Sequence, residues 1–324
     1  MLVGVDIGGT KTAVILAEDP SHILFREEFP TLPKLGPEHA LAKINELIEL
    51  ALKRHSSGKS LQIGVSCGAP LDPVAGIIQS PPNLPTWVEV PIKDILEKRF
   101  GAPCLLENDA NAGAVAEHRY GAGAGCTNLV FLTLGTGIGA GLILNGELYR
   151  GSTNMAGEVG HVTLTEGGPV GYGKAGSVEG WASGWGMALH GVDVVKAAQQ
   201  AGEPTVLAEV AASGQLTSKD IGLAAMNGDA VARRIVKNTG ERLGQALAIL
   251  VDILNPERIV IGGLALRLGS LLFEPALAEM NRHALPQSAQ CCTVLPAQLG
   301  ERIGDVAALC VADGLSRSAT SLDV

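Results

Sequence analysis

Asp109 lies where a single carboxylate can do chemistry, between a predicted strand and a predicted helix. The apolar residues 103–106 precede it, and residues 112–120 have the composition of a helix. At such a junction a carboxylate can cap the free N–H groups of the helix and meet the positive end of its dipole. It can also act as a general base that takes the proton from an attacking hydroxyl. The local pattern alone leaves both interpretations open.

Two glycine-rich turns on either side of Asp109 favour the catalytic interpretation. Residues 6–11 (DIGGTK) and 134–139 (LGTGIG) each lie between two apolar runs, which predicts strand, tight turn and strand. Glycines let backbone N–H groups approach a phosphate, and Asp6 could hold Mg²⁺ directly or through water. A carboxylate between two such turns indicates phosphoryl transfer to a hydroxyl. The repeated plan predicts two related α/β halves that face each other across a cleft.

Polar side chains in three loops are candidates for binding a sugar. Asn83 lies in residues 80–87, where three prolines exclude regular structure, so the loop either presents a fixed amide to a hydroxyl or is a structural turn. Glu158 and Glu179 lie in glycine-rich segments and could grip vicinal hydroxyls through charge-assisted hydrogen bonds. His161 is by residue type more often a structural side chain than a ligand.

Glycines at two strand ends extend the predicted site. Gly68 follows the apolar run 61–66, and loops after strands are where α/β sheets bind ligands. Gly262 and Gly263 end the apolar run 258–261, where a flat adenine could lie against bare backbone. We therefore expect nucleotide contacts near the second glycine pair.

Composition limits the class of protein and its partners. With 324 residues, 46% of them hydrophobic, the chain has material for two domains. We expect an N-terminal domain over 1–120, a larger domain over 121–302, and a final helix over about 303–318 that packs back on the first. A net charge of −9 without a basic run disfavours nucleic acid and membrane surfaces as partners. No CxxC pair, leader or spanning run is seen, so a cytoplasmic protein with free thiols is expected.

The motifs together resemble the ROK family (repressors, open reading frames and sugar kinases) of the actin-like ATPase superfamily. The resemblance runs from Val3 to about Asp313. It rests on DIGGTK, PPNLPTW (81–87), ENDANAGAVAE (107–117), LGTGIGAG (134–141), GEVGH (157–161) and IVIGG (259–263). It implies two actin-like ATPase (ribonuclease H-like) domains with a cleft between them. The resemblance also suggests a homodimer.

The resemblance assigns roles to the candidate residues. Asp109 would be the base that deprotonates a sugar hydroxyl, usually the one on C6. The sugar would be contacted by Gly68, Asn83, Asn108, Glu158, His161 and Glu179. The phosphates and Mg²⁺ of Mg·ATP would lie among Asp6, Gly8, Gly9, Thr10, Lys11, Thr136 and Gly137, with Gly262 and Gly263 at the adenine.

One departure from the family pattern concerns a metal. ROK proteins commonly hold a structural zinc with the histidine of GEVGH and three cysteines in CxCGxxGCxE. The corresponding positions here are Val170, Tyr172 and Ser177. Because a structural zinc needs about four ligands, we expect none, and expect packing by Val170 and Tyr172 in its place.

The favoured function is an ATP-dependent hexose kinase, glucokinase-like, with phosphorylation at C6. Because the chain begins at the first kinase strand, it resembles the enzyme branch of the family. N-acetylmannosamine, another amino sugar, fructose and allose are alternative substrates. A second hypothesis, motivated by the altered zinc segment, is a catalytically weak sugar-sensing or regulatory protein. A carboxylate kinase fits less well, because carboxylates and amides stand where cations would be needed.

Overall fold

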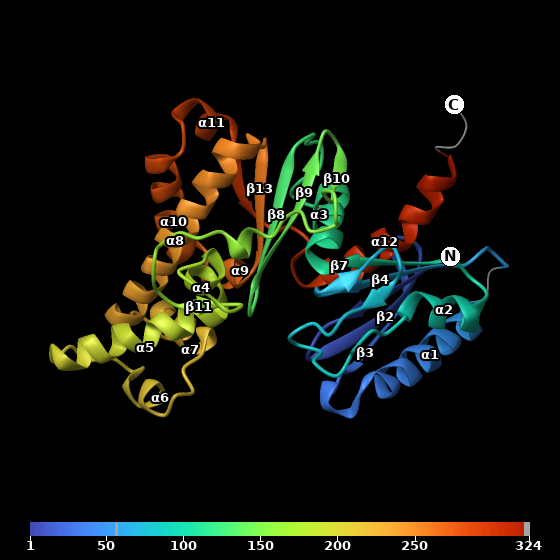
Figure 1. Ribbon diagram of the computed structural model, residues 1–324, viewed down its shortest axis with the longest axis horizontal. Coiled ribbons are helices and arrows are strands. Elements are labelled where there is room, and N and C mark those ends of the chain that lie inside the picture. Colours follow the sequence, from blue (N-terminus) through green and yellow to red (C-terminus); the bar gives the residue numbers. More distant parts are fainter. Residues whose placement is uncertain (56–57, 321–324) are drawn as a thin grey trace. The chain divides into compact units, whose positions relative to one another are not determined.

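The computed structural model describes residues 1–55 and 58–320, and the chain forms two compact α/β units. Unit 1 comprises Met1–Ala124, Gly151–Asn154 and Glu301–Val324 as far as they are described. Unit 2 comprises Gly125–Arg150 and Met155–Gly300. Each unit is built on its own five-stranded sheet (Figure 1).

The sheet of unit 1 has the strand order β3-β2-β1-β4-β7. Its strands are β1 (Leu2–Ile7), β2 (Lys11–Asp19), β3 (His22–Pro30), β4 (Gln62–Cys67) and β7 (Cys104–Asn108). The first three are antiparallel neighbours, whereas β1, β4 and β7 run parallel. The carboxyl ends of β1, β4 and β7 therefore meet at one edge of the sheet, and Asp6, Cys67 and Asn108 lie there.

Helices cover both faces of this sheet. On one face α1 (Pro37–Arg54) and α2 (Ile92–Phe100) bury aliphatic side chains against Val3, Val5 and Ile7. On the other face α12 (Ile303–Thr320) lies across β1 and β4 and packs beside α3 (Asp109–Tyr120). The segment α12 thus returns from the end of the chain to the N-terminal sheet (Figure 1).

The close approach of α12 to the sheet depends on Gly64. A Cβ atom at position 64 would lie 2.2 Å from the backbone nitrogen of Ala312 and 2.4 Å from the carbonyl oxygen of Ala308. Backbone atoms cannot give way as the tip of a flexible side chain does. Any side chain at this position must therefore push α12 away from β4.

We expect Gly64→Ala to lower the free energy of unfolding by about 1–3 kcal/mol, the usual cost of overpacking. Thermal unfolding followed by circular dichroism measures this as a lowered Tm. Gly314→Ala is the matched control, because a Cβ at position 314 of the same helix would meet only Leu105 Cδ1, at 3.8 Å. Equal melting temperatures for the two variants would show that α12 does not press on β4 in this way.

Unit 2 repeats the strand plan of unit 1. Its sheet has the order β10-β9-β8-β13-β14. The strands are β8 (Leu129–Leu134), β9 (Ile138–Leu144), β10 (Glu147–Tyr149), β13 (Arg258–Gly263) and β14 (Thr293–Pro296). Again three antiparallel strands precede two parallel additions. The doubled α/β plan expected from the two glycine turns is confirmed.

The helices of unit 2 are built mainly around α8 (Ala230–Leu254) and α10 (Ser270–His283). These two pack closely because Gly240 and Gly244 face Pro275 and Ala276 with no side chain between. The remaining helices of the unit are α4 (Val178–Ala182), α5 (Gly184–Gln200), α6 (Ala208–Ala212), α7 (Ser218–Met226), α9 (Leu264–Leu268) and α11 (Pro286–Cys291).

The local pattern was misleading at two helix starts. The segment 181–200 reads as one helix, but it is divided at Ser183, whose hydroxyl caps a new helix by accepting from Gly186 N. The N-cap of α3 is Asn108, whose Oδ1 accepts from Ala110 N at 3.0 Å and Asn111 N at 3.2 Å. Asp109 is the first helical residue, so the capping role first considered for it belongs chiefly to its neighbour.

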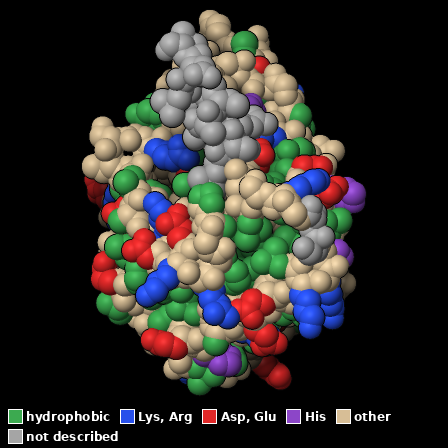
Figure 2. Space-filling model, turned by 90° about the vertical axis from the view of Figure 1, so that its right-hand side faces the viewer, with side chains coloured by type: hydrophobic (Ala, Val, Ile, Leu, Met, Phe, Trp, Pro, Cys, Tyr) green, Lys and Arg blue, Asp and Glu red, His purple; other side chains and the backbone are tan. Residues whose placement is uncertain are grey.

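Surface and thiol features add two observations. On the face shown in Figure 2, basic and acidic side chains are interspersed around apolar ones. All six cysteines are thiols, and of these only Cys291 is exposed. Within the described ranges, no helix combines the length and the apolar character needed to cross a bilayer.

Candidate active site

The first glycine turn joins β1 to β2 and is braced from β3. Gly8 N donates to Lys11 O at 3.0 Å, which closes the turn. Just after β3, Thr31 donates its N–H to Thr10 O and its hydroxyl to Gly8 O at 2.7 Å. These bonds hold the turn carbonyls in place, and the exposed Thr10 and Lys11 lie at its tip. Such a rigid tip suits a phosphate group.

Asp6 lies at the base of this turn, in an environment that disfavours its ionised form. Desolvation raises the pKa of its carboxyl from 3.8 to about 7, and the nearby charges of Asp109 and Asp305 add to the rise. Its Oδ2 lies against Gly304 at the start of α12, where a Cβ atom would be 2.2 Å away. A desolvated, half-buried carboxylate near two other carboxylates is a group that a cation would stabilise.

The donor set around Asp6 fits magnesium better than a metal held by protein alone. Mg²⁺ usually keeps several waters and takes one or two carboxylates together with substrate phosphates. Among the residues that the structure describes, no cluster of three or more His, Cys, Asp or Glu side chains could hold an ion by itself. Asp6 at the base of the first glycine turn meets the magnesium pattern, provided that the turn holds the substrate phosphates.

Asp109 is fixed by the start of α3 but keeps one oxygen for chemistry. Its Oδ1 accepts from Ala110 N at 2.8 Å. Its Oδ2 points toward Gly68, lying 3.8 Å from where a Cβ at position 68 would be. The side chain stays accessible to solvent, while desolvation by the surrounding protein raises the pKa of its carboxyl. Asp109 is thus oriented, accessible and more basic than an ordinary carboxylate.

The loop predicted to present Asn83 has buried anchoring side chains and an exposed amide. Leu84 and Trp87 are fully buried and anchor the loop, while Asn83, directly before Leu84, is exposed. The Asn83 amide also lies 3.9 Å from the Cβ position of Gly68. A side chain on Gly9 would lie 2.6 Å from Asn83 Cβ, so this loop touches the phosphate turn. Unit 1 therefore brings Gly9, Gly68, Asn83 and Asp109 together.

Asn108 has fewer hydrogen-bonding groups available for a ligand than expected. Its Oδ1 is used by the two N–H groups that it caps. Only the amide NH₂ group remains as a donor to a sugar hydroxyl.

In unit 2, Glu179 ties the second glycine turn to the predicted sugar residues. Its Oε2 accepts from Ile138 N at 3.0 Å, directly after the turn. Two glycines approach Glu179 closely. A Cβ added at Gly137 would lie 2.5 Å from Glu179 Oε2, and a Cβ added at Gly160 would lie 3.4 Å from Glu179 Cβ. The turn is also held from α5, because Gly184 N donates to Gly135 O and Trp185 N to Thr136 O.

Glu158 and His161 lie on the same side of unit 2 as Glu179. Both belong to the short 3₁₀ segment that Glu158 caps, and both are exposed. Desolvation raises the pKa of the Glu158 carboxyl, His161 opposes the rise and the charge of Glu179 adds to it. The three predicted sugar residues of unit 2 are therefore close enough to influence one another.

Gly263 requires glycine for two reasons. Its φ is +69°, and a Cβ atom would lie 2.1 Å from Leu134 O. The pair Gly262–Gly263 thus runs beside the end of β8, where the second turn begins. This bare backbone next to a phosphate turn is consistent with a nucleotide base and its phosphates binding near each other.

The residues at the zinc positions do not fit a zinc ion. Val170 is 48% exposed and Tyr172 is 62% exposed, and neither is a zinc ligand of the usual kind. Ser177 is buried and caps α4 by accepting from Gly180 N. Packing by Val170 is not seen, whereas the ring of Tyr172 makes an edge contact with the His161 ring at 5.4 Å.

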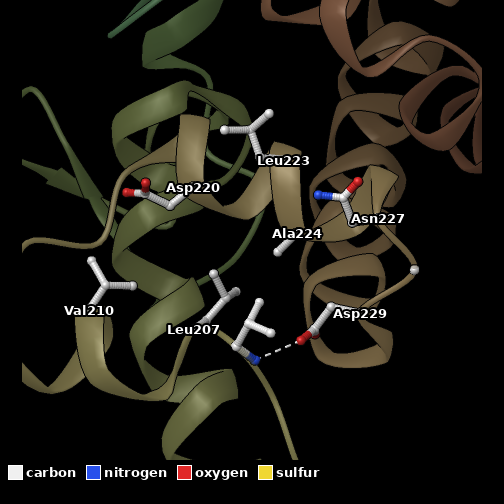
Figure 3. A pocket seen from close by; sticks show the side chains of 9 residues that line it. Leu207, Val210, Asp220, Leu223, Ala224, Asn227 and Asp229 are labelled. Carbon is white, nitrogen blue, oxygen red and sulfur yellow. Dashed lines mark hydrogen bonds between the residues drawn. The ribbon is translucent and has the colours of Figure 1, made fainter.

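A separate cavity in unit 2, of about 560 Å³, contains none of the predicted site residues. It lies among α6, α7 and the start of α8, as Figure 3 shows. Its carboxylates serve the fold, because Asp220 completes a capping box with Thr217 and Asp229 accepts from Val206 N. It is therefore not the candidate active site.

Comparison with known proteins identifies the family. The model of the ROK family matches residues 2–314. The chain belongs to the ROK family. It is 37% identical over 306 residues to a glucokinase of Halalkalibacterium halodurans, covering 93% of this chain and 92% of that one.

Solved structures of ROK proteins have the same fold. A ROK hexokinase from Thermus thermophilus superposes with a TM-score of 0.80 at 31% identity, covering 98% of this chain and 99% of that one. A ROK family glucokinase from Streptomyces griseus, in complex with glucose and AMPPNP, gives a TM-score of 0.78 at 30% identity, covering 97% and 99%.

Several charged residues of this ROK protein that lie beside the candidate site were not predicted from the sequence. Asp305 is 5% exposed, and its Oδ2 accepts from Arg26 Nε at 2.6 Å. Glu28 accepts from both Arg26 and Lys11, so a chain of charges connects the start of α12 with the first turn. No local motif marks these residues, because β3 and α12 are about 280 residues apart in sequence.

Proposed function

We propose that this ROK sugar kinase transfers the γ-phosphoryl group of ATP to the C6 hydroxyl of glucose, with Asp109 as general base. The observation that carries the proposal is the placement of Asp109 Oδ2 beside Gly68 and Asn83, in the same unit as the Asp6–Lys11 turn. Its relatives include glucokinases, and one of the related structures holds glucose and AMPPNP. These support glucose and ATP as the first substrates to test.

In the proposed reaction, Asp109 accepts the hydroxyl proton as the sugar oxygen attacks the γ-phosphorus. The bond between that phosphorus and the β–γ bridging oxygen breaks, and ADP leaves. Asn83, Glu158, His161 and Glu179 hold the other hydroxyls, with Gly68 and Asn108 beside them. Charge-assisted bonds to the carboxylates fix the sugar's orientation.

The remaining predicted residues serve the nucleotide. In the proposal, the phosphates contact two glycine-rich turns, one with Gly8, Gly9, Thr10 and Lys11 and the other with Thr136 and Gly137. The adenine is bordered by Gly262 and Gly263. Asp6 would hold Mg²⁺ through water, and the bound ion would supply charge neutralisation at the phosphates. The proposal includes a homodimer that works in the cytoplasm, as the family resemblance suggests.

Substrate identity and position of attack are tested together with a panel of sugars. We expect kcat/KM to be highest for glucose among glucose, mannose, fructose, allose, glucosamine and N-acetylmannosamine, with ADP release as the readout. 6-Deoxyglucose should inhibit competitively without being phosphorylated. If kcat/KM is highest for another sugar, that sugar replaces glucose as the proposed substrate. Phosphorylation of 6-deoxyglucose would contradict attack by the C6 hydroxyl.

The second candidate is a sugar-sensing protein with weak or no turnover. The rebuilt zinc segment, with Val170 and Tyr172 exposed, favours it. Sugar binding without ADP release on every sugar of the panel would establish it.

A further inference from the structure

The segment 162–177, called here the glycine-rich loop, connects the predicted sugar residues of unit 2. His161 precedes it and Glu179 follows it, and it contains five glycines. Glycine-rich backbone loses much conformational freedom on ordering. Since the residues do not fit a zinc ion, other contacts must hold this loop.

The two ends of the loop are joined by backbone hydrogen bonds. Val178 N donates to Val162 O at 2.9 Å, and Leu164 N donates to Gly176 O at 2.9 Å. Lys174 Nζ donates to His161 O at 2.5 Å. These bonds close the base of the loop. Its outer part packs on α4, because a Cβ at Gly171 would lie 2.4 Å from Gly180 N and a Cβ at Gly180 would lie 2.2 Å from Pro169 O.

The indole of Trp181 adds a side-chain hydrogen bond to this packing. Its Nε1 donates to Thr165 Oγ1 at 2.8 Å. The Thr165 hydroxyl donates in turn to Gly167 O at 2.5 Å, so its proton is committed and its oxygen is an acceptor for the indole. Gly168, with φ +131°, lies against the ring, where a Cβ would be 2.5 Å from Cζ2.

The indole ring of Trp181 also contacts side chains of the long helices α5 and α8. The guanidinium of Arg242, on α8, lies 4.7 Å from the ring centroid of Trp181, a cation–π distance. His190, on α5, contacts the indole at 5.8 Å between centroids and bonds Thr239 on α8 through Nε2 at 3.0 Å. Thr239 donates to Ile235 O, so the neutral tautomer of His190 carries its proton on Nε2.

We propose that Trp181 is a positioning residue that holds the glycine-rich loop without a metal and thereby sets the affinity for sugar. This rests on the function proposed above. Glu179 and Trp181 share the five-residue helix α4, and Ser177, the last residue of the loop, caps that helix. We therefore expect a displaced indole to loosen the loop next to His161 and to shift the helix that carries Glu179.

The test uses variants that remove the hydrogen bond between Trp181 and Thr165 from either side. Thr165→Val keeps the shape of the side chain but removes the acceptor and the hydroxyl's own bond to Gly167 O, whereas Thr165→Ser keeps both. Trp181→Phe removes the donor together with the part of the indole ring that Gly168 contacts. We expect Thr165→Val and Trp181→Phe each to raise the sugar KM and Kd about 3- to 10-fold, as loss of one hydrogen bond allows. The double variant should raise the sugar KM by less than the product of the two single effects, because both substitutions remove the same bond.

Three further readouts separate positioning from general damage. kcat and the KM for ATP should change by less than about twofold, since one hydrogen bond at the loop touches neither the base nor the phosphates. Thr165→Ser should behave like the wild type. Amide hydrogen exchange over residues 162–177 should be faster in Thr165→Val than in Thr165→Ser, even without sugar.

The outcomes also distinguish this proposal from the proposed function. An active wild type whose Thr165→Val variant keeps the wild-type sugar KM and loop exchange would overturn the positioning role. A lowered Tm and kcat with an unchanged sugar KM would likewise show a purely structural contact. A wild type that neither binds nor phosphorylates a sugar would refute the kinase proposal instead. Amide hydrogen exchange in Thr165→Val and Thr165→Ser would still test whether the hydrogen bond to Trp181 holds the loop.

Discussion

The Asp109→Asn variant is expected to lose about 10²- to 10⁴-fold in kcat, the contribution typical of general base catalysis. Asparagine has the same shape and can keep the Oδ1 bond to Ala110 N, so the start of α3 stays intact. It cannot accept the sugar proton. Glucose binding, measured by calorimetry, should remain within a few-fold of wild type, because Asn83 and the residues of unit 2 are unchanged.

The matched control is Asp94→Asn, which alters an exposed carboxylate on α2 of the same unit. It should keep the wild-type rate. The pH profile adds an independent check. Because desolvation raises the pKa of Asp109, the acidic limb of the wild-type kcat/KM profile should lie above the range of an ordinary carboxyl group. An Asp109→Asn enzyme that works at nearly the wild-type rate would exclude this residue as the base.

Replacing Asp6 with Asn should have opposite effects on activity and stability. kcat/KM for Mg·ATP is expected to fall about 10- to 100-fold, as for an outer ligand that acts on a metal through water. The protein without metal should become more stable at alkaline pH, since the substitution removes a desolvated charge next to Asp109 and Asp305.

The pH dependence of this stabilisation follows from the pKa of Asp6. The carboxyl titrates near 3.8 in the unfolded chain and at about 7 in the folded protein. Between these values the folded state binds the additional proton, so the free energy of unfolding falls as pH rises through this window. The gain in Tm of Asp6→Asn, measured in a chelator, should therefore be larger at pH 8 than at pH 5. A gain that is equal at both pH values would contradict the desolvated environment of Asp6 near Asp109 and Asp305.

Much of the site could be predicted because its signals are local. The turn at residues 6–11 needs glycines, and its neighbouring apolar runs form β1 and β2. Asp109 follows a strand whose carboxyl end lies beside that of β4, so its approach to Gly68 follows from ordinary parallel pairing. Gly263 adjoins Leu134 for the same reason.

The parts that sequence reasoning missed depend on side-chain directions and distant pairing. The contact of Gly304 with Asp6 requires α12 to cross the first sheet. Likewise, the apolar pattern around Trp181 predicts a buried helix, but it does not reveal that the indole nitrogen reaches Thr165. The hydrogen bond of Glu179 to Ile138 N depends on how a loop folds back on the turn.

The most direct test of the account is ADP release from Mg·ATP by the purified wild-type protein with glucose as acceptor, followed by identification of the sugar product. We predict saturable ADP release that requires glucose, with glucose 6-phosphate formed in equal amount. A folded protein that binds glucose and ATP but releases no ADP would contradict the phosphoryl transfer assigned to Asp109.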